Sequence, residues 1–88
     1  MLPEMSIVIA AYNEETRLAE SLGKIQAYLA ATGLAAEIIV VDDGSTDNTA
    51  LTVVIRCLEI VGLRLIRYPQ NKGKGCALRT GVLDVISH

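Results

Sequence analysis

The stretch Glu37–Ala50, EIIVVDDGSTDNTA, joins a buried-strand pattern to a polar loop. Its branched aliphatic run, Ile38–Val41, predicts a strand covered on both faces, because such runs are typical of parallel sheets under helices. Two adjacent carboxylates, Asp42 and Asp43, follow at the predicted strand end, and Gly44 and small hydroxyl and amide residues come next. The pattern indicates either a solvated turn with a helix cap or a loop that faces a ligand.

Strand-like runs lie on both sides of this stretch. Ser6–Ala11 is short, apolar and β-branched, and Leu63–Tyr68 alternates apolar and basic residues before Pro69. Both runs predict strands, the second covered on one face and ended by the proline. Each of the three strands precedes a helical segment, which predicts parallel pairing with right-handed crossovers. We therefore expect an α/β fold, a three-layer α/β/α Rossmann-like parallel sheet with the order β-α-β-α-β-α.

Three helices are predicted from apolar residues at helical spacing. Asn13 is expected to cap the first helix, which should end near Ala31 before Gly33. The second follows cap-type residues at 45–47 and should end at residue 62, and the third spans residues 76–87. The predicted core faces are Leu18, Leu22, Ile25 and Leu29 in the first helix, Ala50, Val54, Leu58 and Val61 in the second, and Leu78, Val82, Val85 and Ile86 in the third. Gly81 is either a weak point or a close packing contact.

Composition and charge limit the classes of function. With 88 residues the chain is one domain at most, and its net charge of -2, with both signs dispersed, provides no basic stripe for nucleic acid. No apolar run approaches the roughly 20 residues that span a bilayer, and the N-terminus lacks signal-peptide features, so a cytoplasmic location is predicted. Cys57 and Cys76 have no CxxC spacing and are predicted to be reduced, and His88 is given no role.

Polar clusters follow all three predicted strands: YNEE at 12–15, DDGSTDNT at 42–49 and QNKGKG at 70–75. Ligands of open parallel sheets bind at the carboxyl ends of the strands, so we expect these clusters to form one site. Neither GxGxxG after the first strand nor GxxxxGK[ST] occurs, and the acidic spacing is not that of an EF-hand.

The residue types in these clusters suit a nucleotide. Tyr12 offers a face for stacking on a base, and Asp42 or Asp43 offers acceptors for a base N–H or for ribose hydroxyls. Lys72 and Lys74, with glycines beside them, offer positive charge for phosphate. The sequence therefore predicts a nucleotide site that needs no glycine cradle.

The ordered motifs SIVIAAYNEE, EIIVVDDGSTDNT and NKGKGCALRTGV resemble the N-terminal part of the family 2 glycosyltransferases of GT-A fold. The likeness is closest to the dolichyl-phosphate β-glucosyltransferases, with the dolichol-phosphate mannosyltransferases next. The resemblance implies inverting transfer of a sugar from a nucleotide sugar, such as UDP-glucose or GDP-mannose, to an acceptor such as a polyprenyl or dolichyl phosphate. It also implies that residues 1–88 are a single partial domain, the N-terminal, nucleotide-binding portion of that fold.

The resemblance further implies roles for individual residues. The expected nucleotide contacts are Ala10, Ala11, Tyr12, Glu14, Val41, Asp42, Asp43 and Lys74. Asp43 is the expected contact to the base or ribose, with Val41 and Asp42 beside it. Ala10 stands where many family members have proline; this difference removes no functional group from the expected site.

Members of the family hold Mg²⁺ or Mn²⁺ on the diphosphate with a second acidic motif of DxD type, and no such pair follows Gly81. The resemblance thus implies Mg²⁺ or Mn²⁺ in the intact enzyme, but neither a metal ligand nor a catalytic residue in this chain, which alone is expected to be inactive. The alternative is a non-catalytic nucleotide-binding or self-associating module. Because the family's first strand pairs with a fourth strand, we expect a free edge at Ser6–Ala11 and a homodimer through it.

Overall fold

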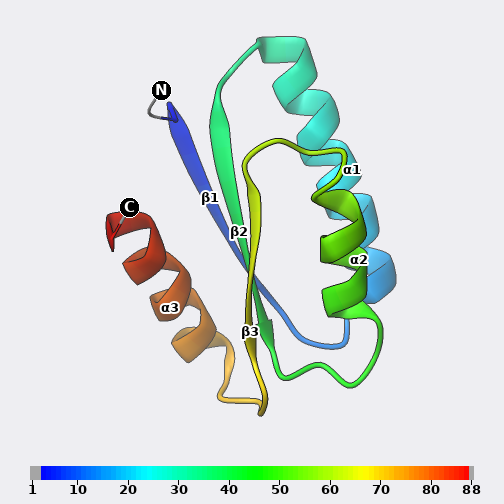
Figure 1. Cartoon of the computed structure of the whole chain (residues 1–88), viewed down its shortest axis with the longest axis vertical. Helices are drawn as coiled ribbons and strands as arrows, with labels where there is room; N and C mark the ends of the chain where they lie inside the picture. The colour runs from blue at the N-terminus through cyan, green and yellow to red at the C-terminus, as the bar shows by residue number, and fades with distance from the viewer. Residues whose placement is uncertain (1–2, 88) are drawn as a thin grey trace.

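The computed structural model describes residues 3–87, with side chains described as far as residue 85, and places three strand-helix units in one sheet (Figure 1). The elements are β1 Met5–Ala11, α1 Glu15–Thr32, β2 Ala36–Asp43, α2 Thr49–Arg56, β3 Leu63–Tyr68 and α3 Lys74–Ser87. The strands are parallel and lie in the order β1-β2-β3. Helices α1 and α2 cover one face of the sheet and α3 covers the other (Figure 1), which confirms the predicted three-layer architecture. His88, for which no role is predicted, lies outside the described residues.

The central strand β2 supplies most of the buried core. Its four predicted residues are fully buried, and the strand extends beyond them at both ends to include both aspartates. Successive side chains of a strand point to opposite faces, so Ile38 and Val40 pack under α1 and α2, whereas Ile39 and Val41 pack under α3. The strand therefore carries two cores, and its next two residues also point to opposite faces.

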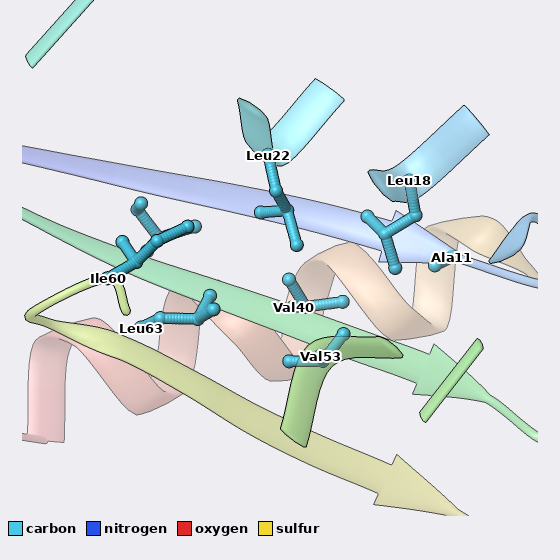
Figure 2. Packing of buried hydrophobic residues seen from close by; sticks show 8 residues of the cluster. Ala11, Leu18, Leu22, Val40, Val53, Ile60 and Leu63 are labelled. Carbon is cyan, nitrogen blue, oxygen red and sulfur yellow. The ribbon is translucent and has the colours of Figure 1, made fainter. Parts of the chain in front are cut away.

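Helix α1 packs on the sheet through its predicted face. Leu18 and Leu22 are buried, and Ile25 and Leu29 pack against the same cluster. Figure 2 shows the first two pointing from α1 toward the sheet. Gly33 ends the helix in the left-handed conformation, with φ of 71°, and its N–H donates to the carbonyl of Leu29 at 2.9 Å. The predicted glycine stop is confirmed.

The predicted core face of α2 is wrong at three of its four residues; the fourth, Ala50, is half-buried. Val54, Leu58 and Val61 are 52%, 88% and 93% exposed, whereas Val53 and Ile60 are buried, as Figure 2 illustrates. The helix ends at residue 56, well before the predicted glycine stop. Its sequence is apolar on more than one side, so residue spacing alone does not decide which stripe packs on the sheet.

Helix α3 approaches the sheet through two small residues, Ala77 and Gly81, which are buried. Two residues predicted to face the core are exposed instead: Leu78 and Val82. Val85 packs against the cluster as predicted, and the side chain of Ile86 lies outside the described residues. Gly81 is a close packing contact with β1, because a Cβ at this position would overlap Val8.

An ion-pair cluster ties α3 to the sheet. Arg64 on β3 lies 3.1 Å from Glu37 on β2 and 2.8 Å from Asp84 on α3. The hydrogen bond to Asp84 is the main reason that the pKa of Arg64 is raised, and Glu37 adds to it. The three elements are thus held in register on this face.

Other sequence predictions concern chemistry outside the core. Cys57 and Cys76 are free thiols. Within residues 3–87, no helix is long and apolar enough to cross a membrane. Over the same residues β1 pairs only with β2, so its outer edge carries no strand.

Candidate functional site

Asp43 joins the loop after β2 to the loop before α3. It is 3% exposed; its Oδ1 accepts the N–H of Lys72 at 2.7 Å, and its Oδ2 accepts the N–H of Gly73 at 2.8 Å. Two charge-assisted hydrogen bonds from successive residues hold the loop firmly on the end of β2. Gly44 permits this approach, because its φ is 73° and a Cβ would lie 2.5 Å from the backbone nitrogen of Asn71.

The loop after β1 is tied to the loop after β2 by reciprocal hydrogen bonds. The Oδ1 of Asn13 accepts the N–H of Thr46 at 2.8 Å, and the N–H of Asn13 donates to Ser45 Oγ at 2.9 Å. The N–H of Glu14 donates to Thr49 Oγ1 at 3.1 Å. The prediction that Asn13 caps α1 is wrong: Glu14 holds the N-cap position without a side-chain cap bond. Donors before and at the start of α1 find their acceptors in the loop after β2 and in the first residue of α2.

Asp47 completes this junction between the loops. Its Oδ2 accepts the N–H of Glu15 at 3.4 Å, and its Oδ1 accepts both the N–H of Thr49, at 2.9 Å, and the Thr49 hydroxyl. The hydroxyl of Thr49 is the main reason that the pKa of Asp47 lies below its ordinary value. A charged carboxylate therefore lies at the start of α1, where the helix dipole favours it.

A pocket of about 220 Å³ opens between the three loops at the carboxyl edge of the sheet. It is lined by Ala10, Ala11, Tyr12, Glu14, Asp43, Asn71, Gly73 and Lys74. Six of the eight residues predicted as nucleotide contacts are in this lining, and Tyr12 is 44% exposed, so its ring is accessible for stacking. The structure adds Asn71 and Gly73, which belong to the QNKGKG cluster already expected at this edge.

The other two predicted contacts, Val41 and Asp42, do not line the pocket. Val41 is buried in the cluster under α3. Asp42 points to the opposite face from Asp43, because neighbours in a strand alternate. Its Oδ1 accepts the N–H of Ser45 at 3.1 Å; its Oδ2 lies 3.4 Å from Arg67 Nε and has no hydrogen-bond partner among residues 3–87. Asp42 stabilises the turn after β2, and Asp43 lines the pocket.

The two lysines of the third loop have different environments. Lys74, the first residue of α3, lines the pocket, whereas Lys72 Nζ lies 5.1 Å from the centroid of the Tyr68 ring. Burial of Tyr68, together with its hydrogen bond to Cys76, raises the pKa of the phenol. Lys72 therefore makes a cation–π contact with a neutral ring, whereas Lys74 brings a positive charge to the lining of the pocket.

Within the described part of the chain, no group of three or more His, Cys, Asp and Glu side chains is arranged to hold a metal ion. The lining of the pocket contains two carboxylates, Glu14 and Asp43. These residues do not form a complete ligand set for Mg²⁺ or Mn²⁺.

A larger cavity, of about 620 Å³, lies at the opposite edge of the sheet. It is lined by residues such as Leu29 near the end of α1, Leu34 between α1 and β2, and Ile60 before β3. Ligands of parallel sheets bind at the carboxyl ends of the strands, and this cavity lies at the amino ends. The smaller pocket between the polar loops is therefore the candidate site.

Comparison with known proteins gives matches over nearly the whole chain. The model of the Glycosyl transferase family 2 matches residues 6–85. Among curated relatives, the dolichyl-phosphate beta-glucosyltransferase of Saccharomyces cerevisiae is 40% identical over 87 residues, and that of Homo sapiens is 35% identical over 88 residues. Each match covers 92% of this chain but only 26% or 27% of the relative, so the chain spans about a quarter of the length of these proteins.

A solved structure also matches nearly the whole chain. The mannosyltransferase PcManGT from Pyrobaculum calidifontis, solved in complex with GDP-Man and Mn²⁺, aligns with a TM-score of 0.79 and 26% identity. The alignment covers 96% of this chain and 25% of that one. It confirms the predicted GT-A type of fold. By the family match and by this structural similarity, the chain belongs to glycosyl transferase family 2.

Proposed function

We propose that this chain is the nucleotide-sugar-binding portion of an inverting glycosyltransferase. The observation that carries the proposal is the pocket at the carboxyl edge of the sheet, where Tyr12, Asp43 and Lys74 meet. Membership of the family supports a transferase over a non-catalytic binding module. The curated relatives are named dolichyl-phosphate beta-glucosyltransferases, which favours a glucosyl donor and a dolichyl-phosphate acceptor.

The chemistry of the pocket suggests how a nucleotide diphosphate sugar is held. The exposed ring of Tyr12 stacks on the base, which is sequence-tolerant and needs no hydrogen bond. Each oxygen of Asp43 accepts one backbone N–H and retains a lone pair for a base N–H or a ribose hydroxyl. Lys74 supplies positive charge toward the phosphates.

The neighbouring transferase was solved with GDP-Man and Mn²⁺, which supports a divalent cation in the intact protein. Such an ion would neutralise charge on the diphosphate leaving group. Because the described residues form no complete ligand set, we do not assign the ion to any of them. A cytoplasmic location, or one at the cytoplasmic face of a membrane, stays a prediction, as does a homodimer through the outer edge of β1.

Calorimetric titration of the 88-residue chain with UDP, UDP-glucose and GDP tests the proposal. We expect UDP to bind and Tyr12→Ala to weaken it by about 5- to 150-fold, the range of a lost base–aromatic stack of roughly 1–3 kcal/mol. Tyr28→Ala is the matched control, because Tyr28 is 52% exposed on α1 and does not line the pocket. A folded sample that binds none of the three ligands, or equal UDP affinity in both variants, would contradict the proposed site.

A further inference from the structure

Asn13 lies between two residues that line the pocket, Tyr12 and Glu14, but does not line it itself. Its φ is 49°, and among the described residues it is the only non-glycine residue with positive φ. The left-handed region is sparsely populated by residues other than glycine, although asparagine enters it more readily than most. Surrounding contacts must therefore hold the backbone at this turn.

Those contacts all come from the loop after β2. The Oδ1 of Asn13 accepts the N–H of Thr46 at 2.8 Å and lies 3.4 Å from both the Thr46 hydroxyl and the N–H of Asp47. The N–H of Asn13 donates to Ser45 Oγ at 2.9 Å, and the N–H of Ser45 donates to the buried carboxylate of Asp42 at 3.1 Å. A continuous chain of hydrogen bonds thus connects the rigid end of β2 to the turn that carries Tyr12.

We propose that Asn13 is a positioning residue of the nucleotide site and acts through Tyr12 and Glu14. By joining the loop after β1 to the loop after β2, it sets the positions of Tyr12 and Glu14 in the pocket lining. The expected effect on nucleotide affinity rests on the proposed function. The hydrogen bonds that join the two loops are a property of the free protein.

The contacts define which chemical group is needed at this position. Each of these hydrogen bonds made by the side chain uses Oδ1 as an acceptor. An aspartate also supplies that acceptor and tolerates the left-handed conformation, whereas glycine supplies only the conformation and alanine supplies neither. The three substitutions therefore separate the hydrogen bonds from the backbone turn.

The test uses ¹H–¹⁵N spectra of the free 88-residue chain, followed by UDP titration. In Asn13→Ala and Asn13→Gly, we expect the Thr46 amide to lose protection from exchange and the amide signals of Tyr12 and Glu14 to move. In Asn13→Asp these signals should stay near their original positions. Asn48→Ala is the control, because Asn48 is an exposed asparagine of the loop after β2 and makes no side-chain cap bond.

For UDP we expect Asn13→Ala and Asn13→Gly to weaken binding by about 3- to 10-fold, the worth of a lost hydrogen bond, with affinity restored in Asn13→Asp. Unchanged UDP affinity in Asn13→Ala, or an equal loss in Asn13→Asp, overturns the proposal. If the wild-type chain binds no UDP, the proposed function fails on its own, and the spectra of the free chain decide the positioning role. In that case the positioning role is supported if the Tyr12 and Glu14 signals move in Asn13→Ala and Asn13→Gly but not in Asn13→Asp. It is overturned if these signals do not move.

Discussion

Gly81→Ala should destabilise the chain, although alanine is the better helix former. Gly81 lies where α3 crosses β1, and a Cβ at this position would stand 2.2 Å from Val8 Cγ1 and 3.3 Å from Val41 Cγ2. Both neighbours are β-branched residues of strands, whose χ1 angles have few alternatives. Either Val8 changes its rotamer or α3 moves away from the sheet.

The expected magnitude follows from two opposing contributions. Overpacking a core costs about 1–3 kcal/mol, whereas replacing glycine by alanine in a helix gains roughly 1 kcal/mol. Gly75→Ala provides the matched control, because Gly75 lies in the same helix and no atom lies within 4 Å of its added Cβ. Since helix propensity acts in both variants, the free energies of unfolding should differ by about 1–3 kcal/mol, with Gly75→Ala the more stable.

Urea unfolding followed by circular dichroism measures this difference, and thermal midpoints should shift by about 4–8 °C per kcal/mol in a domain of this size. Val8→Ala removes the clashing methyl, so Gly81→Ala should cost less in that background than in the wild type. If Gly81→Ala stabilises the chain as much as Gly75→Ala does, the close contact between α3 and β1 is not present in solution and our account of α3 packing is wrong.

Three further predictions concern the loops and the edge of the sheet. Gly44→Ala should destabilise by about 1–3 kcal/mol, because its φ is 73° and the added Cβ would meet the backbone of Asn71 at 2.5 Å; a urea midpoint near that of the wild type would contradict this. Thr49→Val should raise the pKa of Asp47 toward its ordinary value, seen by NMR titration of the carboxyl carbon. Because the pKa of Asp47 is depressed in the folded chain, the associated stability is present above the unfolded pKa of about 3.9 and is lost as the pH falls through the folded pKa. If Asp47 titrates in Thr49→Val as it does in the wild type, the Thr49 hydroxyl is not the main cause of the depressed pKa. The outer edge of β1 should promote self-association, so sedimentation equilibrium at high concentration should detect dimers, and a monomer throughout would exclude them.

Strands and the first helix were predictable because their signals are local and unambiguous. β3 was predicted with its observed bounds, and α1 has one apolar stripe and a glycine stop. The faces of α2 and α3 were not predictable from periodicity. In α2 apolar residues occur on more than one side, and in α3 the contact uses Ala77 and Gly81, whose small side chains carry little hydrophobic signal.

The site was partly predictable for a related reason. Parallel topology alone brings the three polar clusters to one edge, and the resemblance to a family supplied most of the residues that line the pocket. The hydrogen bonds that join the loops were missed, because Ser45 and Thr49 accept from Asn13 and Glu14, which lie 32 and 35 residues away in sequence. Small hydroxyl residues before a helix indicate caps of that helix, and here they accept from the start of another one.

The adjacent aspartates at the end of β2 make different contacts because their side chains point to opposite faces of the sheet. Because neighbouring side chains of a strand point to opposite faces, Asp42 and Asp43 cannot both face one ligand from regular β2. Asp42 accepts from the turn that leads into the second loop, whereas Asp43 accepts from the third loop and lines the pocket. Loss of UDP binding in Asp43→Asn would therefore follow either from a missing ligand contact or from an unseated loop. Protection of the Lys72 and Gly73 amides in that variant separates the two: protected amides with lost binding indicate direct contact with the nucleotide, and exposed amides indicate that Asp43 acts by seating the loop that begins α3.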